Sequence, residues 1–254
     1  MGNTKIIQSL DRALSILELF KLRPKELSVT EISNELQLSK STAFGLINTL
    51  AARGYLHQNP NTQKYSLGMS LLALGEIVHK NQIITEKAKP YLEKLVEMFN
   101  ETVHLAIGEG ESVIYIDKIE GNKTIFINSR IGFKNPMYST GVGKCLLAYS
   151  DREKRNDIIS RMQNMIAYTE NTITDKRRLA EELDLVKKQG YAVDNEEFEK
   201  GLYCLAVPIL DKFGQSIAAI SVSGPTATMK NYDIHQVVDE MKSTASQITK
   251  ELKQ

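Results

Sequence analysis

The chain has 254 residues, and 42% of them are apolar, so it can form one large or two modest domains around a buried core. Its 32 Lys and Arg residues are balanced by 31 Asp and Glu residues, and with a net charge of +1 any basic, nucleic-acid-binding face has to be local. The N-terminal residues hold no apolar run long enough for a signal peptide, and about 18 uncharged apolar residues occur together nowhere in the sequence, so we expect a cytoplasmic protein with no membrane partner.

Cysteine and histidine usage argues against disulfides and metals. Cys145 and Cys204 could pair by number, but a large cytoplasmic domain rarely keeps a disulfide, so we expect two free thiols. The four histidines are isolated and lack the spacing of a metal site: His57, His79, His104 and His235. We therefore expect neither a structural metal nor a cofactor.

Short-range patterns predict the first two helices. Helical spacing links Ile6, Leu10, Leu14 and Leu17, which predicts an amphipathic helix from residue 9 to residue 20. A second helix follows, with residue 28 or residue 30 as a suitable N-cap and an acid at residue 31 in its first turn. Residues 37 and 38 then form a short turn.

A third helix is predicted from Ser39, a good N-cap, to Gly54, a natural helix stop. Its apolar stripe consists of Ala43, Ile47, Leu50 and Ala51. The residues left on its outward face are Lys40, Ser41, Phe44, Gly45 and Asn48. Two β-prone runs, 55–57 and 64–67, then flank the turn-forming tripeptide at 59–61, which predicts a β-hairpin.

The charge pattern of this region is unusual, because no Asp or Glu occurs from Leu36 to Gly75, where the average frequency of acids would place several. Lys40, Arg53 and Lys64 therefore have no acidic neighbours along this stretch, and they fall on the third helix and the hairpin, where a phosphate backbone would lie. A solvated face that is free of acids by chance remains the alternative.

The second helix, the short turn and the third helix match a helix-turn-helix, which seats its last helix in the major groove of DNA. Lys40, Ser41 and Thr42 offer donors to phosphates or base edges, and Asn48 could reach an adenine. A helical bundle would show the same apolar stripe, but the hairpin and the acid-free stretch favour a winged helix-turn-helix that binds double-stranded DNA.

The segment 68–80 is apolar and helical in pattern, and its position favours a connecting helix between two domains over one more core helix. Beyond it the pattern mixes helices with alternating segments, which predicts an α+β sensor domain. The helices are expected at 85–99, 175–189 and 232–252, and the extended segments at 103–108, 112–119, 191–193, 202–210 and 216–223.

Ordered motifs along nearly the whole chain resemble those of IclR-family regulators. The N-terminal motifs are IQSLDRAL (7–14), LSKST (38–42), RGYL (53–56) and YSLG (65–68). The C-terminal motifs are STGVGK (139–144), GYAVDNEE (190–197), GLYC (201–204), AVPI (206–209) and the segment 218–224. The chain departs from the family at Phe44 and Gly45, where many relatives carry a large polar or basic residue.

The resemblance implies a winged helix-turn-helix domain at 1–68, with the helix-turn-helix at about 28–47, a linker helix at 69–82, and a GAF-like α+β domain at 83–254 for effector binding and oligomerisation. Together with the residue pattern it predicts a DNA-binding set, namely Ser28, Lys40, Ser41, Thr42, Phe44, Gly45, Asn48, Arg53 and Lys64. It also implies a homodimer or homotetramer on a pseudo-palindromic operator and, as the family's commoner outcome, repression.

The segment 141–144 invites a phosphate-loop interpretation, but that motif needs a Gly at position 138 and Ser or Thr at position 145, where this chain has Tyr138 and Cys145. The segment instead predicts a loop that opens a helix, whose free N–H groups attract an anion, or a plain Gly-rich cap without a ligand. The resemblance places the effector pocket at Ile127, Gly141, Val142, Asp194, Cys204, Ser221 and Ser223.

Ser221 and Ser223 alternate along a strand and so face the same side. Hydroxyls beside a helix N-terminus suit a small carboxylate, such as a sugar acid or an aromatic acid. One rival function is an enzyme with Cys204 as nucleophile, assisted by His104 or Asp194, although the surroundings of Cys204 are apolar and favour an inert thiol. Another is an adaptor whose winged helix binds proteins. We expect no enzymatic activity.

Overall fold

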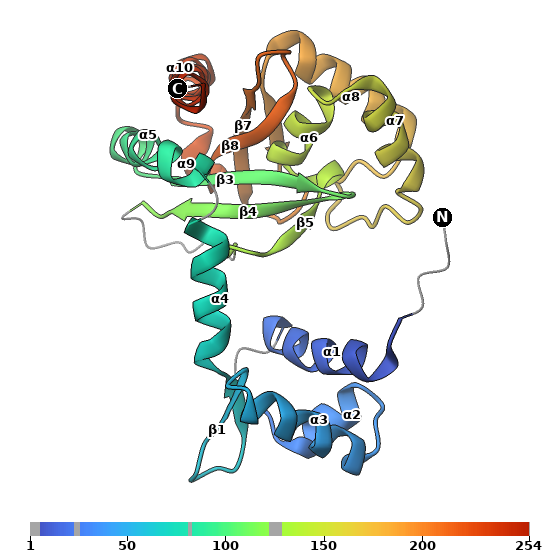
Figure 1. Cartoon of the computed structure of the whole chain (residues 1–254). Coiled ribbons are helices and arrows are strands. Elements are labelled where there is room, and N and C mark those ends of the chain that lie inside the picture. The colour runs from blue at the N-terminus through green and yellow to red at the C-terminus, as the bar shows by residue number, and fades with distance from the viewer. Residues whose placement is uncertain (1–5, 23–25, 81–82, 122–128, 254) are drawn as a thin grey trace. The chain divides into compact units, whose positions relative to one another are not determined.

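The computed structural model describes residues 6–22, 26–80, 83–121 and 129–253. The chain divides into two compact units, Met1–Asn81 and Gln82–Gln254 (Figure 1). The elements of the first unit are α1 (Gln8–Leu22), α2 (Val29–Glu35), α3 (Lys40–Ala52), β1 (Leu56–Gln58), β2 (Tyr65–Leu67) and α4 (Met69–Lys80). Its core is formed by Ile16, Phe20, Leu27, Ile32, Ala43, Ile47, Leu56 and Tyr65.

The helix-turn-helix is held by local hydrogen bonds at both helix starts. At α2, Ser28 and Glu31 form a capping box, in which the Glu31 N–H donates to the Ser28 hydroxyl and the Ser28 N–H donates to the Glu31 carboxylate. The left-handed backbone of Gln37 makes the turn, and the Ser39 hydroxyl then accepts from the N–H of Thr42 to cap α3. Ser28 is thus the cap of α2, and the two predicted helices are confirmed.

The predicted hairpin is also present. β1 and β2 pair antiparallel with Leu56 opposite Leu67, and Leu27 adds a bridge to Tyr65. The Asn59 side chain accepts hydrogen bonds from the backbone of the turn that follows it, as Asn does in Asx turns. The first unit is therefore a winged helix-turn-helix.

The second unit is an α+β domain, as the sequence predicts. Its helices are α5 (Ile83–Phe99), α6 (Gly141–Ala148), α7 (Arg152–Arg161), α8 (Lys176–Gln189), α9 (Thr226–Met229) and α10 (Ile234–Leu252), with a 3₁₀ turn η1 (Met137–Ser139). Its strands are β3 (Thr102–Glu109), β4 (Ser112–Ile119), β5 (Lys134–Pro136), β6 (Ala192–Asn195), β7 (Leu202–Leu210) and β8 (Ser216–Pro225).

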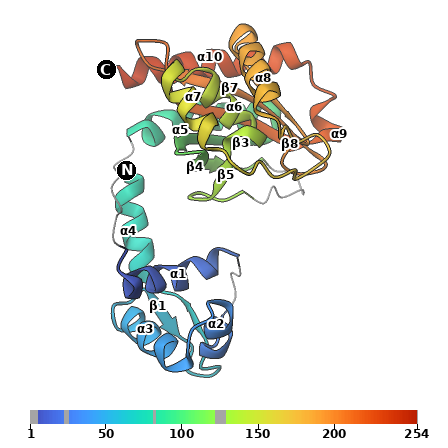
Figure 2. The ribbon, with the colours of Figure 1, turned by 90° about the vertical axis from the view of Figure 1, so that its right-hand side faces the viewer.

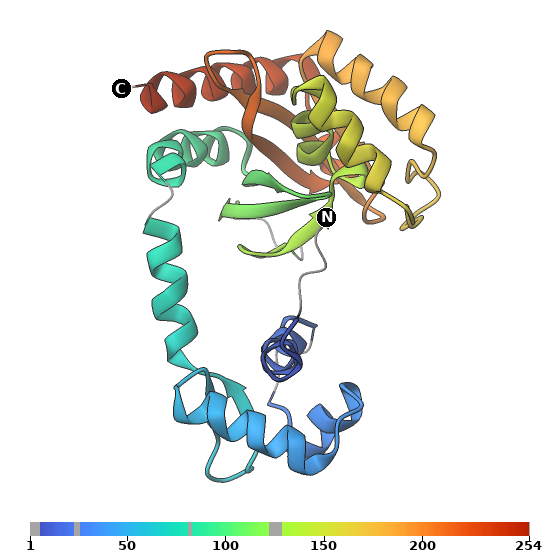
Figure 3. The ribbon, with the colours of Figure 1, turned by 45° about the vertical axis from the view of Figure 1, so that its right-hand side comes forward.

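The six strands form one antiparallel sheet in the order β5-β4-β3-β8-β7-β6. Helices α5 and α10 cover one face of the sheet, and α6, α7 and α8 cover the other (Figures 2 and 3). Because neighbouring residues of a strand point to opposite faces, Leu205 and Val207 enter the core under α5 and α10, whereas Ala206 enters the core under α6.

The structure differs from the sequence predictions in several elements. Helices α7 and α9, strand β5 and the turn η1 were not predicted, because α7 is almost entirely polar with Ile158 alone buried, and the other three have only three or four residues each. A further difference concerns the apolar stripe predicted for the first helix. Ile6, just before α1, and Leu10 and Leu14 within it are exposed, whereas Leu17 packs against the core. Ile16 and Phe20 are the α1 residues that are buried in that core. No helix of the described residues is long and apolar enough to cross a membrane.

Candidate DNA-binding face and effector cavity

The outward face predicted for α3 is exposed. Lys40, Ser41 and Thr42 form its first turn, and all three are exposed to solvent. The Ser39 hydroxyl lies 3.1 Å from that of Ser41 and 2.8 Å from that of Thr42, so three hydroxyls cluster at the helix start. A cation and several hydroxyl donors at a helix N-terminus suit contact with a phosphate.

The middle of the same face is apolar and open. The Phe44 side chain is 51% exposed, which is unusual for an aromatic residue in a domain of this size. Gly45 has no neighbouring atom within 4 Å of the position that a Cβ would occupy, so packing within the chain does not require a glycine there. Asn48 lies exposed one turn after Phe44. Phe44 and Asn48 can thus both reach a partner that docks on α3.

The wing carries acidic neighbours that the sequence did not reveal. The Lys64 ammonium lies 3.5 Å from the Glu31 carboxylate. The expectation that Lys64 lacks an acidic neighbour is therefore wrong for the folded chain. Glu26 accepts hydrogen bonds from the side chains of Asn59 and Thr62 in the turn of the hairpin. Both acids lie outside the acid-free stretch but fold back onto it. Arg53 is exposed at the C-cap of α3.

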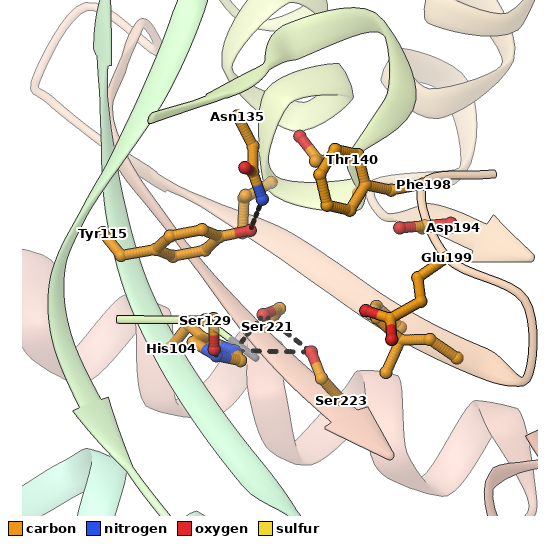
Figure 4. Close-up of a pocket in the computed structure, with 14 residues that line it drawn as sticks. His104, Tyr115, Ser129, Asn135, Thr140, Asp194, Phe198, Glu199, Ser221 and Ser223 are labelled. Atoms are coloured by element: carbon orange, nitrogen blue, oxygen red, sulfur yellow. Dashed lines mark hydrogen bonds between the residues drawn. The ribbon is translucent and has the colours of Figure 1, made fainter. Parts of the chain in front are cut away.

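In the second unit, a cavity of about 40 Å³ lies between the N-terminus of α6 and the sheet (Figure 4). Six of the predicted effector residues line it, namely Gly141, Val142, Asp194, Cys204, Ser221 and Ser223. Ile127 lies outside the described residues. The cavity is completed by His104, Tyr115, Ser129, Asn135, Thr140, Phe198, Glu199 and Leu202.

Strand register explains why residues distant in sequence meet at this cavity. Asp194 of β6 pairs with Cys204 of β7, which pairs with Ser223 of β8. Two residues earlier on β8, Ser221 pairs with His104 of β3. Residues paired across strands share a face, and positions two apart on one strand do too, so these side chains point to the same side of the sheet.

The N-terminus of helix α6 forms part of the cavity wall. The Thr140 hydroxyl caps the helix by accepting from the N–H of Gly143, and Gly141 and Val142 line the cavity. A Cβ on Gly143 would lie 2.3 Å from the carbonyl oxygen of Met137, so only glycine allows α6 to pack this closely on η1. The N–H groups at a helix start carry partial positive charge, which favours an anion in this cavity.

Asp194 is buried at the edge of the cavity, and its carboxylate accepts from the N–H of Glu197 at 2.8 Å. Burial and the negative charge of Glu197 raise the pKa of Asp194 from 3.8 to about 7, against the opposing effects of that hydrogen bond and of the Lys144 charge. Near neutral pH this carboxyl group can therefore be neutral or charged.

A fully buried ion pair supports this edge of the cavity. The Lys144 ammonium of α6 donates to the carboxylate of Glu197 and to the carbonyl of Val193, and it lies 3.3 Å from the carboxylate of Glu182. Burial lowers the pKa of Lys144, but the charges of Glu197 and Glu182 outweigh burial and raise it. Lys144 therefore stays charged and joins α6 to the segment around Asp194.

His104 connects the two serines to the far side of the cavity. Its Nδ1 lies 3.3 Å from the Ser221 hydroxyl and 3.4 Å from the Ser223 hydroxyl, and its Nε2 lies 2.6 Å from the Ser129 hydroxyl (Figure 4). Burial and the Lys118 charge lower the pKa of His104 from 6.5 to about 3. The ring is therefore neutral, with one nitrogen as donor and the other as acceptor.

Cys204 does not have the surroundings of a nucleophile. Burial and the Asp194 charge raise the pKa of its thiol well above the ordinary value, whereas a reactive cysteine needs a lowered one. His104 is hydrogen-bonded to the serines, and Asp194 opposes the thiolate instead of activating it. Cys145 and Cys204 are both buried and free. These surroundings favour Cys204 as an unreactive residue in the wall of the cavity.

The sequence did not reveal the β3–β4 side of the cavity. The sequence pattern indicates His104 as a cavity residue only in the role of an assistant to Cys204, and it gives no indication of Tyr115 or Ser129. The Tyr115 hydroxyl accepts a hydrogen bond from Asn135 at 3.4 Å. These residues reach the cavity because β3 pairs with β8, a contact between segments more than 100 residues apart. A polar residue at position 104, within the apolar run from Val103 to Ile107, was the available signal.

Comparison with known proteins gives two family matches. The profile of the "IclR helix-turn-helix domain" matches residues 9–60, and that of the "Bacterial transcriptional regulator IclR C-terminal" family matches residues 76–250. Together they cover most of both units.

Individual relatives agree with these matches. The chain is 35% identical to the HTH-type transcriptional regulator KdgR of Escherichia coli, over 99% of this chain and 97% of KdgR. It is 30% identical to the HTH-type transcriptional repressor AllR of E. coli, over 87% of this chain and 82% of AllR. The crystal structure of the Thermotoga maritima IclR superposes with a TM-score of 0.79 at 33% identity, over 96% of this chain and 98% of that chain. The chain therefore belongs to the IclR family of DNA-binding transcriptional regulators.

Proposed function

We propose that this regulator is a repressor, and that a small organic or sugar acid bound in the cavity of the second unit controls its affinity for the operator. The proposal rests on one observation, which is that residues predicted separately along the chain meet at the same cavity. Six residues predicted from four separate segments line one cavity, where a helix N-terminus faces two serine hydroxyls. The AllR relative, which bears the name of a repressor, supports the direction of control.

The size of the cavity bears on how control works. At about 40 Å³ it holds only a few water molecules, whereas pockets for small ligands measure about 300–1,000 Å³. A sugar acid enters only if the lining residues move apart. A ligand that binds the widened state better than the closed one shifts the protein toward the widened state. The ligand thereby supplies free energy that can alter DNA binding.

In the first unit, we assign phosphate contacts to Lys40, Arg53 and Lys64, the last in competition with Glu31. The hydroxyls of Ser28, Ser41 and Thr42 add donors at the starts of α2 and α3. Base contacts fall to the middle of α3, with Asn48 suited to adenine and Phe44 to the methyl group of thymine. Gly45 leaves room between them for the DNA to approach the helix.

A homodimer or homotetramer on a pseudo-palindromic operator fits the exposed apolar surface of the first unit. Ile6, Ile7, Leu10 and Leu14 are exposed at α1, and Met69, Leu72, Ile77 and Val78 are exposed on α4, the proposed linker helix. A second copy would bury these side chains and present a second α3. Sedimentation is expected to give a dimer or tetramer, and a monomer both free and on DNA would contradict this. As a DNA-binding regulator it acts in the cytoplasm.

The proposal is tested in two steps on the full chain. A thermal-shift screen against small organic and sugar acids is expected to identify an acid that raises the melting temperature, because a ligand that binds only the folded state stabilises it. A gel shift on duplexes selected from a random library should then show that the same acid releases the operator. Binding to DNA without sequence preference would favour the adaptor, and turnover that depends on the Cys204 thiol would favour the enzyme.

A further inference from the structure

We propose that His104 is a positioning residue of the cavity: it carries its proton on Nδ1, donates it to the Ser221 and Ser223 pair, and so leaves one serine hydroxyl free to donate to the effector. The inference rests on the proposed function and deepens it, because it defines the chemistry of the effector group that docks at the serines. That group must be a hydrogen-bond acceptor, and a carboxylate fits best.

The positions of the two serines around Nδ1 favour this tautomer. Both hydroxyl oxygens lie at nearly the same distance from Nδ1, at 3.3 Å for Ser221 and 3.4 Å for Ser223. A single N–H can be shared between two oxygen acceptors in a three-centre bond, which is common in proteins. A bare Nδ1 could accept from only one hydroxyl, because the other hydroxyl donates within the pair. The oxygen of that other hydroxyl would then lie against the ring lone pair with no proton between them. The symmetric placement therefore indicates a proton on Nδ1.

The other ring nitrogen points to the same assignment. Nε2 lies 2.6 Å from the Ser129 hydroxyl, which is shorter than the usual range of about 2.7–3.2 Å for an N–H that donates to oxygen. The distance therefore favours the Ser129 hydroxyl as the donor and Nε2 as the acceptor. Since a neutral ring carries one proton, Nδ1 must then hold it.

The proton count at the serine pair shows what this tautomer achieves. The two hydroxyls lie 3.1 Å apart, so one of them donates to the other. With the proton on Nδ1, the ring also donates to the pair, and the second hydroxyl proton remains available to the cavity. With the proton on Nε2, the ring would take that second proton. The pair would then offer the effector only lone pairs.

The hydrogen bonds then form one continuous chain. It runs from the Ser129 hydroxyl through the His104 ring to the serine pair, and from the serine pair to the effector.

The ring itself can be measured without any ligand. In the full chain labelled with ¹⁵N, a long-range ¹H–¹⁵N spectrum distinguishes a protonated ring nitrogen from a bare one, and the signals lost in His104→Asn identify this ring. Ser129→Ala gives a second assignment, because it removes the hydroxyl partner of Nε2 only. We expect a protonated Nδ1 and a bare Nε2, unchanged between pH 8 and pH 5. A proton on Nε2, or a doubly protonated ring at pH 6, would overturn the proposal.

A matched pair of variants tests the consequence with sodium acetate, the simplest stable carboxylate probe. His104→Asn keeps an N–H donor near the Nδ1 position, whereas His104→Leu removes it. In NMR titrations we expect His104→Leu to weaken acetate binding roughly tenfold and His104→Asn to restore most of it. Equal affinity in wild type and His104→Leu would also overturn the proposal. If wild type does not bind acetate, the carboxylate effector of the proposed function is in doubt, and the ring tautomer alone decides the role of His104.

Discussion

The proposed DNA-binding face consists of exposed side chains on α3 and the hairpin that follows it, within one stretch of the chain. The effector cavity instead collects buried side chains from β3, β4, β6, β7, β8 and the start of α6. On the exposed face, a substitution can change binding with little effect on folding. In the cavity, where charged and polar groups are buried and paired, binding and stability depend on the same contacts.

The largest effect that separates the two regions is expected at the buried ion pair. Lys144→Met leaves Glu197 buried without its cation and should lower the free energy of unfolding by about 3–5 kcal/mol. Lys200→Met is the matched control, because Lys200 pairs with Glu170 where both side chains are well exposed, and it should cost at most about 1 kcal/mol. Urea unfolding measures both, and equal losses would show that Lys144 adds nothing by being buried.

The pH dependence of effector binding sharpens the comparison further. The pKa of Asp194 is about 7, so the group is largely neutral at pH 6 and ionised at pH 8. An ionised Asp194 repels a carboxylate in the same cavity, so affinity for the acid should fall roughly tenfold between pH 6 and pH 8. Calorimetry at several pH values should show this fall in wild type and a flat profile in Asp194→Asn. Affinity that rises with pH would contradict it.

The same carboxyl group affects stability in a defined direction. Because its folded pKa is raised above the ordinary value of 3.8, the folded state binds more protons than the unfolded state between pH 4 and pH 7. The contribution of Asp194 to stability is therefore present at low pH and lost as pH rises through 7. Asp194→Asn should remove this part of the pH profile.

On the DNA-binding face, Lys40 and Lys64 provide a test of electrostatics. Replacing Lys40 with Ala should weaken binding to all DNA sequences and flatten the plot of log K against log salt by about one unit, if it neutralises one phosphate. Lys64→Ala should change the slope less, because Glu31 already offsets part of its charge. Gel shifts at several salt concentrations give both slopes. An unchanged slope in Lys40→Ala would remove Lys40 from the interface.

The smallest effect is expected at Gly45. Nothing lies near its missing Cβ, and glycine within a helix costs about 1 kcal/mol relative to alanine, so Gly45→Ala should stabilise the first unit by up to that amount. If DNA approaches the helix at this point, the same variant should bind the operator more weakly although it is more stable. Thermal unfolding and a gel shift test both halves, and undiminished operator binding would place the DNA away from Gly45.

The features that could be predicted from the sequence are those that depend on residues close together in the chain, and the features that were missed depend on contacts between distant segments. The helix-turn-helix and the hairpin depend on caps and turns such as Ser28, Ser39 and Asn59, which are visible in a few consecutive residues. The start of α6 and the shared face of Ser221 and Ser223 were predicted from local pattern, and their place in the effector pocket came from the family resemblance. The placement of His104 beside Ser221 could not be predicted, because it depends on strand order. The contact between Lys64 and Glu31 was missed because it depends on how the hairpin packs beside α2.

The central claim is that the cavity binds the acid and the first unit binds the operator. It is tested most directly by two measurements on one variant. Ser221→Ala with Ser223→Ala removes two polar partners at almost constant volume, and each lost hydrogen bond costs about 0.5–1.5 kcal/mol, more for a charged partner. On one preparation, calorimetry with the acid found in the screen should show an affinity at least roughly tenfold lower. A gel shift without ligand should show wild-type operator binding. Wild-type affinity for the acid would place the sensor site elsewhere, and lost operator binding in a folded variant would show that the two functions are not separable.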